Sequence, residues 1–112
     1  MVTSLKGAIV IINFPFSNML GTKRRPALVI ADWKADDVIL CQITSIANKD
    51  EFAVELTESD FISGSLVQKS YIRCNKLFTA DKRTFLRTAA IISKSKILEV
   101  INSIHNLLDT KV

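Results

Sequence analysis

Short runs of apolar and β-branched residues recur at close spacing through most of the chain, and residues typical of turns separate them. Runs of this length indicate strands, and their close spacing favours a small β-barrel over alternating βαβ units. The expected strands cover residues 8–14, 27–31, 38–44, 52–56 and 65–74, with weaker candidates at 77–79 and 90–92.

Proline, glycine and polar residues mark the breaks between these runs. Pro15 ends the first run because proline cannot donate to a strand ladder, and a polar loop over residues 17–25 follows it. Further turns are expected at residues 35–37, at residues 48–50 and at Gly64.

The apolar pattern changes its period near the C-terminus. Apolar residues spaced by four, three and four positions form one face of an amphipathic helix: Ile97, Ile101, Ile104 and Leu108. Ser93 or Ser95 is the expected N-cap. We expect this face to cover one end or side of the barrel, with a dimer interface as the alternative. A shorter helical piece is expected at residues 81–87. The fold class is therefore mainly β with a C-terminal α-helix.

Length and composition place the chain among globular proteins. Its 112 residues fit a single domain covering residues 1–112, and 48% of them are hydrophobic. Lys and Arg total 15 against 11 Asp and Glu, and the net charge of +4 favours an anionic partner without naming one. The first apolar run is short and has no small-residue cleavage site after it, so it indicates a strand rather than a signal peptide or membrane span. We therefore expect a cytoplasmic protein with no membrane partner.

Several classes of site do not fit this composition. Cys41 and Cys74 lie in apolar stretches and indicate buried free thiols, and two cysteines with one histidine do not make a zinc site. His105 lies in the expected helix and fits an ordinary surface position, so a nuclease built on paired histidines is excluded. With three glycines the chain carries neither a phosphate loop nor a dinucleotide fingerprint. We expect no metal and no cofactor.

Three consecutive cations, Lys23, Arg24 and Arg25, stand before Pro26 and a buried run. They form either a solvated loop or a clamp for phosphate. The guanidinium of Arg25 is the best fixed of the three because it adjoins the proline, and a planar guanidinium can grip two phosphate oxygens at once. Lys23 and Arg24 are better suited to following a phosphate backbone.

Two other polar clusters are candidates for the same ligand. Thr44 and Ser45 end a strand, where their hydroxyls either cap a turn or hydrogen-bond to a phosphate or ribose. Under strict alternation Lys69, Tyr71 and Arg73 share one strand face. That face is either ordinary exposed surface or a place where a base stacks on the tyrosine while cations hold its phosphate.

The stretches GAIVIINFPFSNMLGTKRRPALVI, ILCQITS, FAVEL and SYIRCNKLFTADK, followed by the closing helix, resemble the MazF/PemK family of toxins from bacterial toxin–antitoxin pairs. The likeness is collinear over nearly the whole chain. It implies a compact SH3-like β-barrel with a C-terminal helix, usually a homodimer. It also implies a metal-independent endoribonuclease that cuts single-stranded mRNA at short sequence motifs. The implied protein partner is an antitoxin that fills the RNA groove.

The resemblance also assigns site residues. The arginine before proline and the threonine of the ITS stretch are the family's catalytic pair, which maps onto Arg25 and Thr44, and the PemK branch adds Arg73. Ser45 and Tyr71 join Lys23 and Arg24 as substrate-binding residues. Asn75 stands where the PemK branch has a catalytic aspartate, and an amide cannot act as a base, so we assign it to reading a base edge.

Two rival functions share this fold. A catalytically weak or inactive RNA-binding member is one alternative, and Asn75 is the feature in its favour. The gyrase-poison toxins are the other, but they end in Trp-Gly-Ile, whereas this chain ends in DTKV and its only tryptophan is Trp33.

Overall fold

The computed structural model describes residues 4–15, 21–47 and 50–110. Within them, alternation of apolar and polar residues builds antiparallel strands, and the change of period after residue 92 builds one α-helix. The strands are β1 (Ala8–Pro15), β2 (Thr22–Ala31), β3 (Asp37–Thr44), β4 (Ala53–Leu56), β5 (Phe61–Gly64), β6 (Ser70–Asp81) and β7 (Arg87–Ile92). The helix is α1 (Lys94–Leu108), and two short 3₁₀ turns are η1 (Glu58–Asp60) and η2 (Lys82–Thr84).

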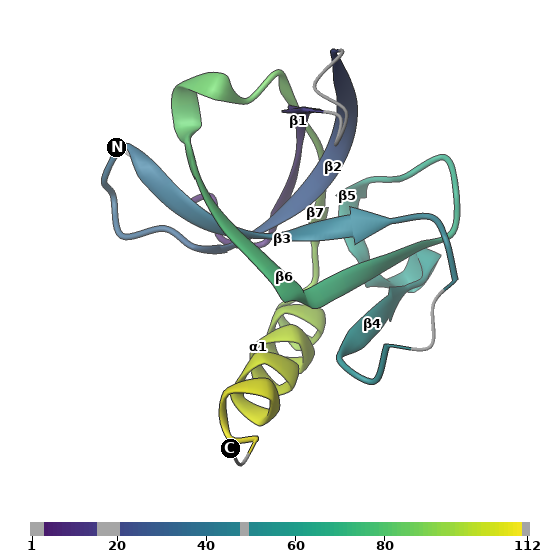
Figure 1. Ribbon diagram of the computed structural model, residues 1–112. Helices are drawn as coiled ribbons and strands as arrows, with labels where there is room; N and C mark the ends of the chain where they lie inside the picture. Colours follow the sequence, from purple (N-terminus) through teal and green to yellow (C-terminus); the bar gives the residue numbers. More distant parts are fainter. Residues whose placement is uncertain (1–3, 16–20, 48–49, 111–112) are drawn as a thin grey trace.

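All strands join one sheet in the order β4-β6-β3-β2-β1-β7-β5. The sheet curls into a half-barrel (Figure 1). Apolar side chains are buried on both of its faces. The cluster under the helix includes Ile9, Leu28, Ile72, Ile92 and Val100. The cluster on the opposite face includes Val10, Ala27, Val29, Val38 and Leu40. The predicted class, mainly β with a C-terminal helix, is confirmed.

Several local expectations are corrected. Residues 22–25 are not loop, because β2 begins at Thr22 and pairs with β1 through Asn13↔Arg24 and Ile12↔Arg25. Gly64 closes β5 instead of forming a turn between strands, and β6 begins only at Ser70.

The expected helical piece at residues 81–87 is only the 3₁₀ turn η2, held by Asp81, whose side chain accepts a hydrogen bond from the backbone N–H of Arg83. The weak candidate at 77–79 is the second half of β6. Parts of two other predictions, residues 17–20 of the polar loop and residues 48–49 of a turn, lie outside the described residues.

A bulge bends β6 in its middle. Gln42 pairs with Arg73 but its neighbour Cys41 pairs with Leu77, so residues 74–76 have no partners on β3. Bulges sharpen the bend and twist of a strand, and Figure 1 shows β6 turning at this point. The bend lets one strand pair along its length with β3 while its first part also pairs with the short strand β4.

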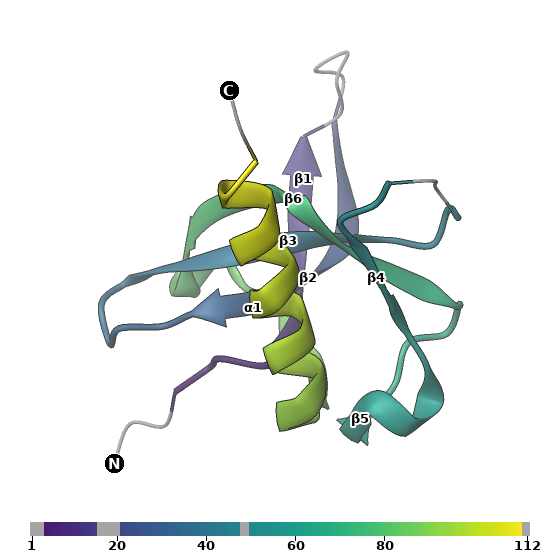
Figure 2. The same cartoon turned by 90° about the horizontal axis from the view of Figure 1, so that it is seen from below.

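The helix lies against one face of the curled sheet (Figure 2), where it contacts β4 and β6. Ser93 is the N-cap, with its Oγ accepting a hydrogen bond from Lys96 N at 3.3 Å. Val100 and Ile104 are buried, and Ile97 packs against the same cluster. The predicted apolar face therefore covers the protein's own sheet, although Leu108 at its end is exposed.

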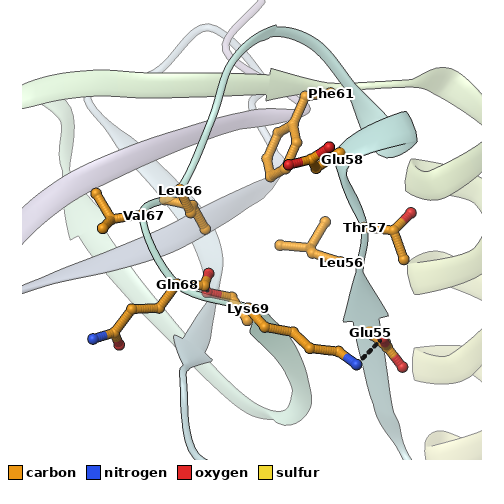
Figure 3. A pocket seen from close by; sticks show the side chains of 10 residues that line it. Glu55, Leu56, Thr57, Glu58, Phe61, Leu66, Val67, Gln68 and Lys69 are labelled. Atoms are coloured by element: carbon orange, nitrogen blue, oxygen red, sulfur yellow. Dashed lines mark hydrogen bonds and ion pairs between the residues drawn. The ribbon is translucent and has the colours of Figure 1, made fainter.

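β4 and β5 are the two edges of the sheet, and the chain joins them through η1. We call the gap between these edge strands the seam. Residues 65–69, which lead from β5 to β6, pass beside it. Lys69 ties this segment to β4, because its Nζ lies 2.9 Å from Glu55 Oε1 (Figure 3).

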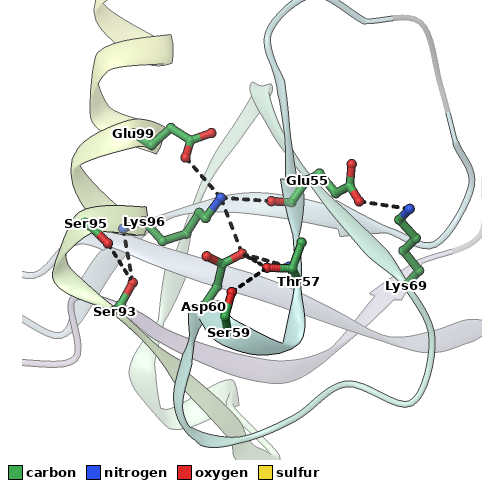
Figure 4. Close-up of polar contacts among 9 residues, drawn as sticks. All are labelled: Glu55, Thr57, Ser59, Asp60, Lys69, Ser93, Ser95, Lys96 and Glu99. Carbon is green, nitrogen blue, oxygen red and sulfur yellow. Dashed lines mark hydrogen bonds and ion pairs between the residues drawn. The ribbon is translucent and has the colours of Figure 1, made fainter.

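Lys96 joins the helix to both sides of the seam (Figure 4). Its Nζ donates to the main-chain oxygen of Glu55 at 3.1 Å and to Glu99 Oε1 at 3.0 Å, and it lies 3.4 Å from Asp60 Oδ2. Burial alone would raise the pKa of Asp60, but hydrogen bonds from Thr57 and the charge of Lys96 outweigh it and lower that pKa. Burial likewise disfavours the Lys96 ammonium, yet Glu99 and Asp60 raise its pKa.

We expect Lys96→Met to lower the free energy of unfolding by about 2 kcal/mol near neutral pH, because Asp60 and the Glu55 carbonyl lose a charged donor. The Asp60 contribution is present above its usual pKa of 3.8 and is lost as pH falls through the lower value in the folded protein. The Lys96 contribution is present below its usual pKa of 10.5 and is lost as pH rises through its raised folded value. Thermal melts of both proteins across this range measure the difference.

Lys94→Met is the matched control, because Lys94 is an exposed lysine on the same helix. Its melting temperature should stay close to that of the unchanged protein at every pH. Equal losses in the two variants would show that the seam contact contributes nothing specific.

Candidate functional site

The three consecutive cations line one side of a cavity of about 390 Å³ that opens where β2 begins and β3 ends. We call it the cationic cavity. Thr44 and Ser45 line it from β3 and the turn after it, and the segment before β6 forms another wall. Its lining residues are Ile11, Lys23, Arg24, Arg25, Pro26, Ile43, Thr44, Ser45, Ser65, Leu66, Val67, Gln68, Ser70, Arg87 and Ala89.

Strand pairing explains why Arg25 and Thr44 share this cavity. The antiparallel strands β2 and β3 pair as far as Ala27↔Gln42, which brings the start of β2, with Arg25, to the same end of the sheet as the end of β3, with Thr44. The two residues that local sequence singled out separately therefore face one ligand-sized space.

The hydroxyl of Thr44 has a defined orientation. Its Oγ1 accepts a hydrogen bond from the backbone N–H of Ile46 at 3.1 Å, which is the turn-capping arrangement expected for a strand-ending threonine. A hydroxyl that accepts one hydrogen bond still has its own proton to donate. The cap thus fixes the oxygen and leaves its O–H available to a ligand in the cavity.

Arg87 is a fourth cation at the cavity, and no pattern in the local sequence indicates it. Ile11 of β1 pairs with Pro26 on one side and with Arg87 on the other. Because β1 lies between β2 and β7, it brings Arg87 to the same cavity as Arg25 although 62 positions separate them in the chain. No local motif marks Arg87, and only the long-range strand order reveals it.

The cavity concentrates positive charge without internal compensation. Lys23, Arg24, Arg25 and Arg87 are all exposed, and none forms an ion pair with a carboxylate in the part of the chain that the structure describes. Other cations are paired, such as Lys82 with Asp32 at 2.9 Å. Four neighbouring unpaired cations repel one another, and a bound anion relieves that repulsion.

Arg73, Tyr71 and Asn75 do not line the cationic cavity. Arg73 lies between Gln42 and Ala53 on the neighbouring strands, with its Nη2 3.8 Å from Asp50 Oδ2. Its Nε is buried and has no hydrogen-bond partner among the described residues.

The other two residues, Tyr71 and Asn75, also lie on β6. Tyr71 pairs with Thr44 across β3 and β6 and is half-buried. Asn75 is exposed within the bulge of β6. Lys69, which was expected to share a strand face with Tyr71, precedes β6 and is paired with Glu55. A hydrogen bond to Glu55 is the main cause that raises the pKa of Lys69.

The remaining titratable candidates stay outside the site. Cys41 and Cys74 are buried free thiols, as predicted, and a hydrogen bond with Cys74 together with burial raises the pKa of Cys41. His105 is exposed on α1. Among residues 4–15, 21–47 and 50–110, no group of three His, Cys, Asp or Glu side chains is placed to hold a metal ion. No described helix is long and apolar enough to cross a membrane.

The sequence of strands, the closing helix and the Arg-Pro and Thr-Ser positions fit one family. The family model for the PemK-like, MazF-like toxins of type II toxin–antitoxin systems matches residues 5–108. The chain belongs to this family. No individual curated protein is similar enough in sequence to extend the comparison.

Solved structures share the fold of this MazF/PemK-family toxin. An endoribonuclease in complex with its cognate antitoxin, from a mycobacterial species, has a TM-score of 0.76 at 14% identity, with 98% of this chain and 99% of that chain covered. The MazE–MazF complex of Deinococcus radiodurans has a TM-score of 0.75 at 23% identity, with 99% and 100% covered. The toxin MazF-mt6 of Mycobacterium tuberculosis has a TM-score of 0.68 at 18% identity, with 92% and 99% covered. At these identities the likeness establishes the fold, a curled antiparallel sheet with one C-terminal helix.

Gly64 holds one wall of the cavity in place. Its φ of +68° suits glycine, and a Cβ there would overlap the main-chain oxygen of Ala89, a residue that lines the cavity. We expect Gly64→Ala to lower the free energy of unfolding by about 2 kcal/mol or more, since the backbone must move to relieve both strains. Chemical denaturation measures this loss.

The adjacent Ser65→Ala change is the control, because it removes only an exposed hydroxyl and should alter stability by less than about 0.5 kcal/mol. If Gly64→Ala unfolds at the same denaturant concentration as Ser65→Ala, then the close approach of β5 to β7 does not fix the position of this wall of the cationic cavity.

Proposed function

We propose that this chain is the toxin of a type II toxin–antitoxin pair and that it cleaves single-stranded mRNA as a metal-independent endoribonuclease at short sequence motifs. One observation carries the proposal: Arg25 and Thr44 line the same cationic cavity. Two of the solved structures that share the fold are themselves described as endoribonucleases, which agrees with this chemistry.

The cavity fits a phosphodiester better than it fits other anions of similar size. The planar guanidinium of Arg25 can donate to two phosphate oxygens, and Thr44 can donate its O–H to a third acceptor. Lys23 and Arg24 precede Arg25 on β2 and can hold neighbouring phosphates of the same RNA strand. Ser45 adds a hydroxyl at the turn after β3. An extended polyanion uses all of these donors, whereas a single small anion would use only a few.

RNA supplies its own nucleophile. In the proposed reaction the 2′-hydroxyl oxygen attacks the adjacent phosphorus, a new P–O2′ bond forms, and the P–O5′ bond breaks. The 2′-hydroxyl gives up its proton and the departing 5′-oxygen gains one. The products are a 2′,3′-cyclic phosphate and a 5′-hydroxyl, and no covalent enzyme intermediate is needed.

The site residues act on alignment and charge. Holding the 2′-oxygen, phosphorus and 5′-oxygen in line can contribute roughly 7–11 kcal/mol in favourable intramolecular cases. A fixed donor aimed at the charge that develops on the phosphoryl oxygens contributes about 3–4 kcal/mol more. Arg25 stabilises that charge or protonates the leaving oxygen. Thr44 donates to a phosphoryl oxygen or orients the 2′-hydroxyl.

The residues beside the cavity complete the proposed RNA path. Tyr71 stacks on a base, and Asn75 on the exposed bulge reads a base edge. Arg73 binds a phosphate from the β6 side, and this requires its guanidinium to turn from Asp50. Antitoxin binding and homodimer formation are part of the same proposal, because solved structures of this fold include toxin–antitoxin complexes. An antitoxin segment with acidic and apolar residues would complement the cationic cavity.

A second candidate function is RNA binding without turnover. It is favoured by Asn75, which cannot accept a proton as a carboxylate does, and by the position of Arg73 outside the cavity. A chain of this kind would keep the cationic cavity and bind RNA while leaving it intact.

We expect expression of the unchanged chain to arrest bacterial growth and to create new 5′-hydroxyl ends in mRNA. Arg25→Ala and Thr44→Ala should each lower the cleavage rate by about 10²–10³-fold, because each removes a donor to the developing charge. Cleavage of a purified RNA should persist in EDTA. A 2′-deoxy nucleotide at the cut position should abolish it, since that position then has no nucleophile.

Two results would decide against cleavage. Cutting of the 2′-deoxy substrate would rule out attack by the 2′-hydroxyl. Binding of RNA with no new 5′ ends would instead establish the RNA-binding function. Arg25→Ala should retain the melting temperature of the unchanged chain, since Arg25 is exposed, and Thr44→Ala should lower it only slightly, since the turn after β3 loses one exposed hydrogen bond.

Arg87 should contribute to RNA affinity through charge. We expect Arg87→Ala to weaken binding of single-stranded RNA of any sequence and to lower the slope of log affinity against log salt by about 1. Arg83→Ala is the control, because Arg83 lies outside the cavity and is paired with Asp81. Equal salt slopes for the unchanged chain and Arg87→Ala would remove Arg87 from the RNA path.

A further inference from the structure

A second cavity, of about 320 Å³, lies at the seam. We call it the seam cavity. The end of β4, η1 and the start of β5 form one side of it, and residues 65–70 form the other. Its lining residues are Glu55, Leu56, Thr57, Glu58, Phe61, Leu66, Val67, Gln68, Lys69 and Ser70.

The seam cavity has an apolar interior and a polar rim (Figure 3). Leu56 is buried, and Phe61 and Leu66 are half-buried and pack against the core cluster. Glu58 and Gln68 stand at the rim with exposed side chains. An apolar space that includes an aromatic ring and is edged by hydrogen-bonding groups suits a flat, polar-edged ring such as a nucleobase.

The two cavities share a wall. Leu66, Val67, Gln68 and Ser70 line both of them, so the segment between β5 and β6 separates the seam cavity from the cationic cavity by the thickness of one chain. A ligand that extends across this segment occupies both the seam cavity and the cationic cavity. A nucleic acid strand fits this arrangement, because its charged backbone and its uncharged bases are separate parts of one chain.

The charges of the two cavities differ in sign. The cationic cavity presents Lys23, Arg24, Arg25 and Arg87, whereas the seam cavity presents two carboxylates and one lysine. Lys69 is paired with Glu55 at 2.9 Å, while the Glu58 carboxylate has no hydrogen-bond or ion-pair partner in the described part of the chain. A phosphate is repelled from Glu58, and a hydrogen-bond donor is attracted to it.

We propose that the seam cavity binds a base of the RNA whose phosphate lies in the cationic cavity, and that Glu58 selects a base with an exocyclic amino group. This inference rests on the proposed function, since it names part of the substrate of that site. A carboxylate accepts hydrogen bonds from an amino group, as it does from N4 of cytosine. Uracil presents a carbonyl oxygen at the corresponding position, and two acceptors repel one another. The seam cavity thus distinguishes cytosine from uracil although the two rings have nearly the same shape.

Binding of an RNA that cannot be cut tests this inference apart from catalysis. The probes are a short oligouridine with 2′-fluorine in place of every 2′-hydroxyl, and the same oligomer with one central cytidine. The unchanged chain should bind the cytidine oligomer about tenfold more tightly. Glu58→Gln should bring the two affinities close together, because an amide can also donate to uracil. Glu58→Lys should reverse the preference, since an ammonium donates to the uracil carbonyl.

Glu51→Gln and Glu51→Lys are the matched controls. Glu51 is exposed and lines neither cavity. Its two substitutions change the charge of the protein by the same amounts as the Glu58 substitutions do. Both controls should keep the cytidine preference, while the added positive charge of Glu51→Lys raises all affinities. The ratio of the two affinities cancels such a general effect.

The outcomes separate this inference from the proposed function. Equal binding of the two oligomers by the unchanged chain, or a preference that survives in both Glu58 variants, would overturn the base assignment and leave RNA cleavage standing. A cytidine preference that depends on Glu58, in a chain that does not cut ordinary RNA, would support the base assignment and overturn the cleavage proposal. No affinity for either oligomer would overturn both.

Discussion

The contact of Lys96 with both edges of the sheet is the interaction on which the rest of the structure depends. A curled sheet that does not close leaves two edge strands, and their unpaired backbone groups must be covered. Here one ammonium group from the helix reaches a carbonyl of β4 and the carboxylate that precedes β5. The helix that covers the core thereby also fixes the width of the seam. Because residues 55–58 and Phe61 line the seam cavity, the same contact affects both the packing of the core and the shape of this cavity.

The order of strands, in turn, determines the electrostatics. β1 lies at the inner part of the sheet and pairs with both β2 and β7, so residues from the beginning and the end of the chain meet beside it. Arg25 and Arg87 come together for this reason alone. Hydrogen bonds between the strands and the burial of apolar side chains supply the free energy that holds these like charges near one another. The positive potential is thus present before any ligand arrives, and an anion meets donors that need little rearrangement.

Local sequence is sufficient for the fold class and for most strands, and it singles out Arg25 and Thr44, which both line the cationic cavity. Alternation locates strands, and a change of period locates the helix, because both are local properties. The failures have a physical cause in common. Residues 22–25 are polar and looked like loop, but pairing with β1 makes them strand. The bulge at residues 74–76 and the contribution of Arg87 depend on partners far away in the chain, which no local pattern encodes. The seam cavity likewise depends on segments that are separate in the chain, so no local pattern predicts it.

The segment between β5 and β6 connects these features into one surface. Gly64, the last residue of β5, has a positive φ where β5 contacts β7, and the Lys69–Glu55 pair fixes the other end of the segment to β4. Between these two points the chain has one face in the cationic cavity and the other in the seam cavity. Charge on one side can hold a backbone of any sequence, while hydrogen-bonding groups on the other can distinguish one base from another. A change at Glu58, which lines only the seam cavity, can therefore alter which sequence is bound without altering the donors that line the cationic cavity.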